Sequence, residues 1–254
     1  MRALAGVSVL FWLVPAVLAQ GPVLVHGGGG DVREAYDWFV AQVPSKQVIV
    51  LDYTGDPGIP TVRRLEASGA QVRYLPVASR TAAQDSSIVQ AVRAADALFF
   101  PGGNQYRYVQ RWADTPLQRA IQAAHRRGAA IGGTSAGAMI LGEVVFDARD
   151  GTVTTPDALD DPMGIPLLDG FLNILPGFIV DTHFAERGRI GRLAAWLAQR
   201  TVRHPTRFLE GLGVDTDTAV AIEPDGTMTV FGDGTLTLLG QPLSGIDVED
   251  GLDA

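Results

Sequence analysis

Short apolar runs alternate with helical stretches over the first half of the chain, and this alternation constrains the fold most strongly. The runs lie at residues 23–25, 47–52, 71–75, 97–100 and 129–131. Apolar residues recur at helical spacing between them, as in residues 84–95 and 117–127. This pattern predicts a mostly parallel sheet with helices on both faces. In such sheets ligands bind at the carboxyl ends of the strands.

The second half of the chain continues the pattern less regularly. Residues 177–180 predict a strand, and a helix follows to about residue 201. Residues 142–170 are rich in Pro, Gly and Asp, and we expect a hairpin of residues 143–146 with 151–154, then a loop over the site. Asp-Gly turn dipeptides predict two paired antiparallel edge strands, at residues 227–231 and 235–239. These patterns together predict an α/β fold with a mostly parallel sheet and antiparallel C-terminal edge strands.

Composition limits the classes of protein that the chain can belong to. Of the 254 residues, 46% are hydrophobic and 19% are charged, which allows a large core. The net charge of −8 argues against nonspecific nucleic-acid binding. The absence of cysteine excludes disulfides, thiolate metal sites and a cysteine nucleophile. With no repeat or linker, we expect residues 20–254 to form a single domain.

The N-terminus has the features of a secretory signal peptide. Arg2 precedes an apolar stretch, and Val17-Leu18-Ala19 places small residues at the −3 and −1 positions of a cleavage site. We therefore expect residues 1–19 to be removed and the mature protein to be extracytoplasmic, with no stable membrane anchor. The alternative is an uncleaved anchor, although the apolar run is short for a membrane span.

The stretch Gly133-Thr134-Ser135-Ala136-Gly137 matches the nucleophile-elbow pattern. In that pattern a strand turns sharply into a helix and leaves one serine exposed at a helix N-terminus, where backbone N–H groups favour negative charge. The alternative is an ordinary tight turn. A serine nucleophile also needs a base, and the best candidate is His183, because it too follows an apolar strand. His26, at the end of the first strand, is the second candidate.

Backbone groups near the serine could form an oxyanion hole. The amide of Ala136 would supply one donor, and Gly102 or Gly103 the second, unless these glycines only shape a turn. A glycine loop, residues 27–30, follows the first strand but matches neither nucleotide-binding fingerprint, so we interpret it as a close-packed turn lining a pocket.

Arg187, Arg189 and Arg192 follow His183 closely, although the protein is acidic overall. Cations at the start of a helix oppose its dipole, so stability does not explain them. Binding of a substrate carboxylate does, and a solvated basic face is the alternative.

Three motifs together resemble the cyanophycinase family of serine peptidases, which also holds the aspartyl dipeptidases. The motifs are Pro101-Gly102-Gly103-Asn104-Gln105, Gly133-Thr134-Ser135-Ala136-Gly137-Ala138 and the segment from Asp181-Thr182-His183-Phe184 to Arg192-Leu193. The resemblance spans residues 23–222 and implies a flavodoxin-like three-layer α/β/α sandwich, in agreement with the pattern of strands and helices. It also implies that Ser135 is the nucleophile and His183 the base. It also implies a substrate pocket formed by Gln105, Asp181, Arg187, Arg189 and Arg192. The implied substrate is cyanophycin, an aspartate backbone carrying arginine, and the product is a β-aspartyl-arginine dipeptide.

The chain departs from the family at two positions. Thr182 replaces a glutamine of the pocket, which makes aspartyl dipeptides an alternative substrate. Thr216 stands where the family has the glutamate of its triad. Catalysis would then use a dyad or take its acid from Glu210, Asp215 or Asp217, or the protein would bind peptides without catalysis. The expected partner is a peptide rich in Asp and Arg, without nucleic acid, metal or cofactor, and a homodimer is one oligomeric state that the sequence allows.

Overall fold

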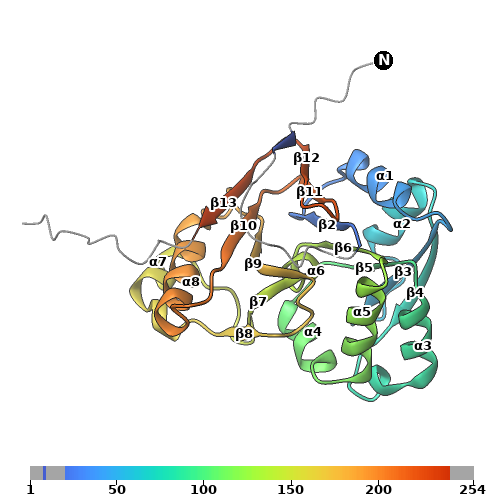
Figure 1. The fold of residues 1–254 in the computed structure, drawn as a ribbon, viewed down its shortest axis with the longest axis horizontal. Helices are drawn as coiled ribbons and strands as arrows, with labels where there is room; N and C mark the ends of the chain where they lie inside the picture. The colour runs from blue at the N-terminus through green and yellow to red at the C-terminus, as the bar shows by residue number, and fades with distance from the viewer. Residues whose placement is uncertain (1–7, 10–20, 241–254) are drawn as a thin grey trace, which may run out of the picture.

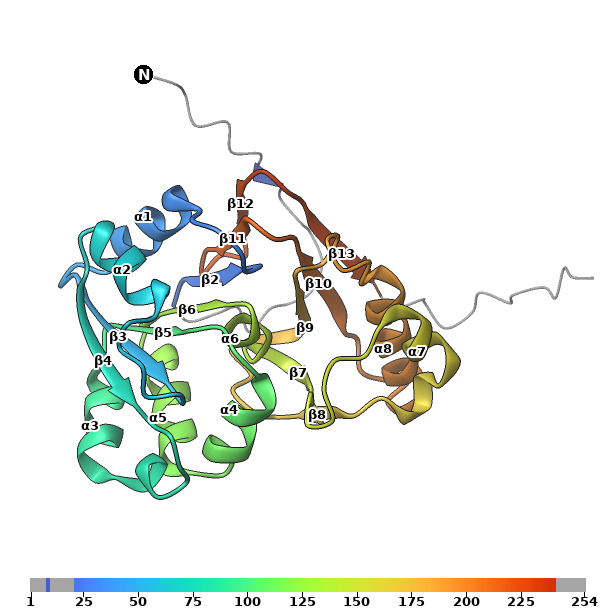
Figure 2. The ribbon, with the colours of Figure 1, turned by 180° about the vertical axis from the view of Figure 1, so that it is seen from behind.

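The computed structural model describes residues 8–9 and 21–240, which form two sheets with helices packed against them (Figures 1 and 2). The predicted signal peptide, residues 1–19, lies outside the described residues except for β1 (Ser8–Val9), which pairs with strand β12. The C-terminal residues 241–254 of the predicted domain also lie outside the described part.

The first sheet has the strand order β1-β12-β11-β2-β6-β5-β3-β4. Neighbouring strands from β2 to β4 in this order are parallel, whereas β11 and β12 are antiparallel to their neighbours. Its strands are β2 (Val23–His26), β3 (Gln47–Asp52), β4 (Gln71–Pro76), β5 (Ala97–Phe100), β6 (Ala130–Thr134), β11 (Thr218–Ile222) and β12 (Met228–Gly232).

Helices cover both faces of this sheet because neighbouring strand residues point to opposite sides. Leu24 packs in a cluster with residues of α1 (Arg33–Ala41) and α2 (Pro60–Ala67). Val23 and Val25 pack in a second cluster with residues of the helical segments on the other face. Those segments are η1 (Ala82–Gln84), α3 (Ser86–Ala94), α4 (Gln105–Trp112) and α5 (Pro116–Arg126).

The second sheet has the order β13-β10-β9-β7-β8, with β10, β9 and β7 parallel and an antiparallel strand at each edge. Its strands are β7 (Gly142–Phe146), β8 (Leu167–Asp169), β9 (Leu175–Thr182), β10 (Glu210–Val214) and β13 (Leu236–Gly240). One face packs on α7 (Thr155–Asp160) and α8 (Ile190–Arg203), and η2 (Pro162–Gly164) lies beside them.

Two predicted strand pairings are wrong. Strand β7 pairs with β8 rather than with residues 151–154, because the intervening segment forms α7 with a capping box at Thr154. Strands β12 and β13 do not pair with each other either. They pair with β11 and β10, and so belong to different sheets.

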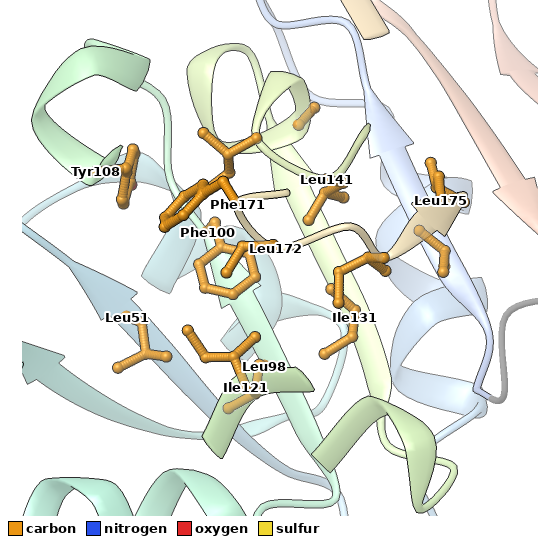
Figure 3. Close-up of a cluster of buried hydrophobic side chains, with 14 of the residues drawn as sticks. Leu51, Leu98, Phe100, Tyr108, Ile121, Ile131, Leu141, Phe171, Leu172 and Leu175 are labelled. Atoms are coloured by element: carbon orange, nitrogen blue, oxygen red, sulfur yellow. The ribbon is translucent and has the colours of Figure 1, made fainter. Parts of the chain in front are cut away.

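The two sheets share one hydrophobic core. Figure 3 shows Phe171 and Leu172, from the segment between β8 and β9, beside Phe100 of β5. The Nε2 atom of Gln118 on α5 donates to the carbonyl oxygens of Gly170 (3.1 Å) and Phe171 (2.6 Å), which fixes the same segment. The segment that leads into β9 of the second sheet is therefore held against the first sheet and its helix α5.

The predicted α/β fold, with mostly parallel strands and antiparallel C-terminal edge strands, is confirmed. Among the described residues, no helix combines the length and the apolar character that crossing a membrane requires.

Candidate active site

Ser135 lies in the sharp turn between β6 and the short helix α6 (Ala136–Met139). Its backbone has φ 53° and ψ −122°, a conformation that non-glycine residues rarely adopt. Steric crowding explains why a glycine lies two residues before and two residues after the serine. A Cβ at Gly133 would lie 2.2 Å from the carbonyl oxygen of Gly137, and one at Gly137 would lie 2.1 Å from that of Phe100. The sequence pattern therefore marks a strained turn that presents one serine.

His183 directly follows β9 and faces Ser135 across the boundary between the two sheets. The Oγ of Ser135 lies 3.1 Å from Nε2 of His183. The side chain of His183 is 15% exposed. Burial lowers its pKa below the ordinary 6.5, Arg187 lowers it further, and Glu186 partly opposes the shift. The imidazole is therefore neutral at neutral pH.

The glycine loop after β2 joins the two sheets at the site. The amide of His183 donates to the carbonyl oxygen of Gly27 (2.9 Å), and the amide of Asp217 donates to that of Gly28 (2.9 Å). Gly28 has φ +99°, and a Cβ there would lie 2.3 Å from Nε2 of His183. This agrees with the interpretation as a close-packed turn, because the loop uses its backbone to position the histidine.

The second ring nitrogen of His183 has two partners. Its Nδ1 lies 3.1 Å from Oγ1 of Thr216 and 3.4 Å from Oε2 of Glu186. The hydroxyl of Thr216 donates a short hydrogen bond to the same oxygen of Glu186. An ionised carboxylate only accepts hydrogen bonds, so Nδ1 carries the proton and Nε2 is left to accept from Ser135.

The predicted acids lie elsewhere. The carboxylate of Asp215 accepts from the amides of Ala185 (2.9 Å) and Thr235 (2.8 Å), and that of Asp217 accepts from the amide of Gly30. Glu210 lies at the opposite end of β10 from Val214, the residue that pairs with Thr182. Burial raises the pKa of Glu210.

Sequence reasoning missed Glu186. The available signal was its position three residues after His183, which brings two side chains to one side of a tight turn.

The predicted oxyanion residues all border Ser135. Ala136 is the first residue of α6 and lines the cavity beside the serine. A Cβ at Gly102 would lie 3.3 Å from Cβ of Ser135, so glycine allows this close approach. Gly103 has φ +140° and also lines the cavity, and a Cβ there would lie 2.3 Å from the hydroxyl of Tyr53.

Asp181 and two of the arginines form a buried ionic cluster. Asp181 is 0% exposed and Arg192 is 1% exposed. The Nε of Arg192 donates to Oδ2 of Asp181 (2.7 Å), its Nη2 donates a short bond to Oδ1, and Nη1 of Arg189 lies 3.3 Å from the same Oδ1. The Arg192 guanidinium also lies over the rings of Trp196 and Phe146. Asp181 therefore holds the arginines and does not itself line the cavity.

A cavity of about 170 Å³ opens beside Ser135 and His183. Its lining includes Gln105, Thr182 and the three predicted arginines Arg187, Arg189 and Arg192. Residues 151–152 close one side, and Thr152 and Val153 accept hydrogen bonds from Arg192 (3.1 and 3.0 Å). The volume is below the roughly 300 Å³ of typical small-molecule pockets, which fits one residue of a peptide better than a long segment.

The other predicted features are distributed as follows. His26 is buried, and its Nδ1 accepts from the amide of Gly28 (3.0 Å), so it supports the glycine loop; burial lowers its pKa to about 4. The polar helical run around His125 predicts a solvated side chain, and this is wrong: His125 is buried on α5, with Nδ1 3.4 Å from the carbonyl oxygen of Ala129. His204 follows α8. No cluster of three or more metal-ligating side chains occurs in the described part of the chain.

Comparisons with known proteins agree with this architecture. A family model described as peptidase family S51 matches residues 60–230, more than half of the chain. A cyanophycinase from a Nostoc species is 32% identical over 217 residues, covering 80% of this chain and 68% of the relative. One from Geminocystis herdmanii is 34% identical over 162 residues, covering 63% and 55%.

Two solved structures share the fold. A peptidase from an acI-B1 actinobacterium has a TM-score of 0.66 at 18% identity, with 89% of this chain and 92% of that chain covered. A putative peptidase E from Listeria monocytogenes has a TM-score of 0.55 at 18% identity, with 82% and 97% covered. The family match and the identity to the Nostoc relative together show that the chain belongs to peptidase family S51, as a cyanophycinase-like serine-type peptidase.

Proposed function

We propose that the protein is an exported serine exopeptidase in which Ser135 is the nucleophile and His183 the general base. The observation that carries the proposal is the 3.1 Å contact between Oγ of Ser135 and Nε2 of His183, made on a strained turn beside an arginine-lined cavity. A neutral imidazole with its proton on Nδ1 can accept the serine proton without rearrangement.

The reaction proceeds by acyl transfer. Oγ of Ser135 attacks the scissile carbonyl carbon while Nε2 of His183 takes its proton, and the amides of Ala136 and of Gly102 or Gly103 are the donors to the oxyanion. The imidazolium then returns the proton to the leaving amine as the C–N bond breaks. Water, deprotonated by the same histidine, hydrolyses the acyl-enzyme and restores the serine.

We propose cyanophycin as the substrate, cleaved to β-aspartyl-arginine dipeptides. Two observations support it: several relatives carry the name cyanophycinase, and Arg187, Arg189 and Arg192 line the cavity where a substrate carboxylate would bind. Purified protein is incubated with cyanophycin, and soluble dipeptides are measured by mass spectrometry. Dipeptide release that Ser135→Ala abolishes, and that Ser45→Ala at an exposed serine leaves intact, is the expected result. Equal release by Ser135→Ala contradicts the proposal.

Aspartyl dipeptides are a second candidate substrate, favoured by the state of Asp181. Both of its oxygens are taken by Arg189 and Arg192, and none of the cavity-lining residues in the described part of the chain is a carboxylate. A pocket that is cationic in this way favours an anionic aspartyl group over an arginine side chain. A panel of Asp-X dipeptides compared with β-Asp-Arg and cyanophycin by kcat/KM distinguishes the two. If only cyanophycin is cleaved efficiently, this second candidate fails.

Export rests on the N-terminal sequence. We expect a protein recovered outside the cytoplasm to begin at Gln20, and a variant lacking residues 2–19 to stay with a cytoplasmic marker in cell fractionation. An N-terminus that still contains residues 2–19 in the exported protein would show an uncleaved anchor.

A further inference from the structure

We infer that Glu186 replaces the missing triad acid and positions His183, both directly and through the hydroxyl of Thr216. The inference deepens the proposed function and rests on it, since it assigns a residue to the proposed Ser135–His183 pair. Glu186 is a positioning residue, because it contacts the base and not the reacting atoms.

The turn after β9 brings Glu186 back to the histidine. The amide of Arg187 donates to the carbonyl oxygen of His183 (3.3 Å), and the amide of Gly188 donates to that of Ala185 (3.0 Å). The amide of Ala185 donates to the carboxylate of Asp215 (2.9 Å), which ties the turn to β10. These bonds fix the backbone on both sides of Glu186, so its contact with the imidazole does not depend on a free loop.

The side chains of His183, Glu186 and Thr216 form one hydrogen-bonded cluster. The Nδ1 of His183 lies 3.4 Å from Oε2 of Glu186 and 3.1 Å from Oγ1 of Thr216, and the Thr216 hydroxyl donates to the same Oε2. Thr216 has one hydroxyl proton, and it is used on Glu186, so the Thr216 oxygen is left to accept from Nδ1–H. The threonine thereby links the base to the carboxylate.

The other nearby carboxylates are not available for this role. Asp215 accepts the amide of Thr235 and its hydroxyl (2.8 and 2.7 Å) in addition to the amide of Ala185, and Asp217 accepts the amide of Gly30. The cationic groups near the imidazole are Arg187 and Arg189, and neither stabilises an imidazolium. Glu186 is therefore the group that opposes them.

Glu186 acts as a triad acid would, but from a more solvent-exposed position. The carboxylate fixes the tautomer with the proton on Nδ1 and stabilises the imidazolium that forms when Ser135 attacks. The side chain of Glu186 is 52% exposed, so water screens its charge. We expect its loss to reduce reactivity by about 10- to 100-fold, less than the roughly 10⁴-fold loss seen when a buried triad aspartate is replaced.

The test uses the purified protein and two readouts. The first is the rate at which a fluorophosphonate labels Ser135, located by peptide mapping. The second is the pKa of His183 followed by NMR of the imidazole, which is assignable because the chain has only four histidines and His183→Asn removes one signal. The variants are Glu186→Gln, Thr216→Val, Thr216→Glu and the double variant Thr216→Glu/Glu186→Gln. Glu66→Gln, at an exposed glutamate of α2, is the matched control for loss of one negative charge.

Glu186→Gln is expected to slow labelling by about 10- to 100-fold and to lower the pKa of His183, Thr216→Val to have a smaller effect in the same direction, and Glu66→Gln to change neither. Thr216→Glu places a carboxylate directly beside the histidine. In that background Glu186→Gln should cost less than threefold, and this rescue would not occur if Glu186 only held the turn.

An unchanged His183 pKa in Glu186→Gln overturns the inference. So does a lower pKa with unchanged labelling, or the same loss in both backgrounds. A wild-type protein whose Ser135 does not label in a His183-dependent way overturns the proposed function and, with it, the positioning role. The NMR result distinguishes the two failures, because it reports the Glu186 contact whether or not the serine reacts.

Discussion

Removing the charge of Asp181 should strongly destabilise the protein, because this carboxylate pairs with the buried guanidinium of Arg192. Asp181 is 0% exposed and accepts from Nε and Nη2 of Arg192, while Arg189 approaches the same carboxylate. Asp181→Asn keeps the shape of the side chain and removes its charge. The guanidinium of Arg192, 1% exposed, then remains buried without a counter-charge, at a cost of about 3–5 kcal/mol.

Urea unfolding and thermal melting measure this loss. A total stability of about 5–15 kcal/mol is usual for a domain, so the variant should lose a large fraction of it. At roughly 2–4 °C per kcal/mol for a chain of this size, the expected fall in Tm is about 6–20 °C. The matched control is Asp37→Asn, which breaks the 2.8 Å pair with Arg33, in which both side chains are about half exposed (50% and 51%). That change should cost far less, because water solvates the guanidinium that remains.

If the uncompensated charge of Arg192 causes the loss of stability, removing that charge should restore part of it. Adding Arg192→Met to Asp181→Asn removes the buried cation and fills its space with an apolar side chain, so the double variant should be more stable than Asp181→Asn alone. Equal urea midpoints for Asp181→Asn and Asp37→Asn would refute the argument, and so would a double variant less stable than Asp181→Asn.

Three other predictions follow from the strained and titrating groups of the site. Ser135→Gly should be about 1 kcal/mol more stable to urea than Ser135→Ala. Relief of the positive φ (about 1–3 kcal/mol) exceeds the entropy cost of glycine (about 0.5–1 kcal/mol), whereas Ala67→Gly in α2 should destabilise the protein. A Ser135→Gly variant less stable than Ser135→Ala would contradict backbone strain at this position. The pKa of His26 is lowered from 6.5 to about 4 in the folded protein, so the unfolded chain binds the proton more tightly and stability falls as pH drops from 6.5 to 4. At about 1.4 kcal/mol per pH unit, the wild type should lose roughly 3 kcal/mol more than His26→Asn over that range, and identical urea profiles would refute this. The acid limb of the kcat/KM profile should lie below pH 6.5, because the base must be neutral and the pKa of His183 is lowered. Arg187→Gln should move this limb to higher pH, because Arg187 lowers the pKa of His183. A limb that stays in place would exclude Arg187 as a cause of the lowered pKa.

The first sheet could be predicted from the sequence because its signals are local. Apolar runs bounded by glycine and helical spacing identify β2, β3, β4 and β5 to within one residue at each end, and β6 continues three residues beyond its predicted end. The partition of the C-terminal strands could not be predicted in this way. The Asp225-Gly226 turn joins β11 to its antiparallel partner β12, but the Asp233-Gly234 turn does not join a pair, because the partner of β13 is β10, which precedes β11 in the chain.

The same distinction applies to the site. Ser135 and His183 each follow an apolar strand, so their convergence can be argued from topology. The partner of Nδ1 cannot, because Glu186 reaches it only through the turn at His183, whose φ is 49°, and the spacing of three residues from His183 is a weak signal by itself. The buried position of Asp181 is hidden for a similar reason, since the arginines that enclose it lie eight and eleven residues further along the chain.

The backbone explains how the site can accommodate threonine at position 216. The base is held by main-chain bonds, with the amide of His183 on Gly27 and the amide of Asp217 on Gly28, and the missing Cβ of Gly28 leaves room for the ring. The position of the His183 backbone therefore does not depend on an acid. What remains for a carboxylate is to orient the ring, to keep the proton on Nδ1 and to stabilise the imidazolium, and electrostatic stabilisation decreases gradually with distance and exposure instead of being lost at once. An acid that moves from position 216, after β10, to the turn after β9 can thus keep part of its effect, whereas a shift of Gly28 or Ser135 cannot be compensated.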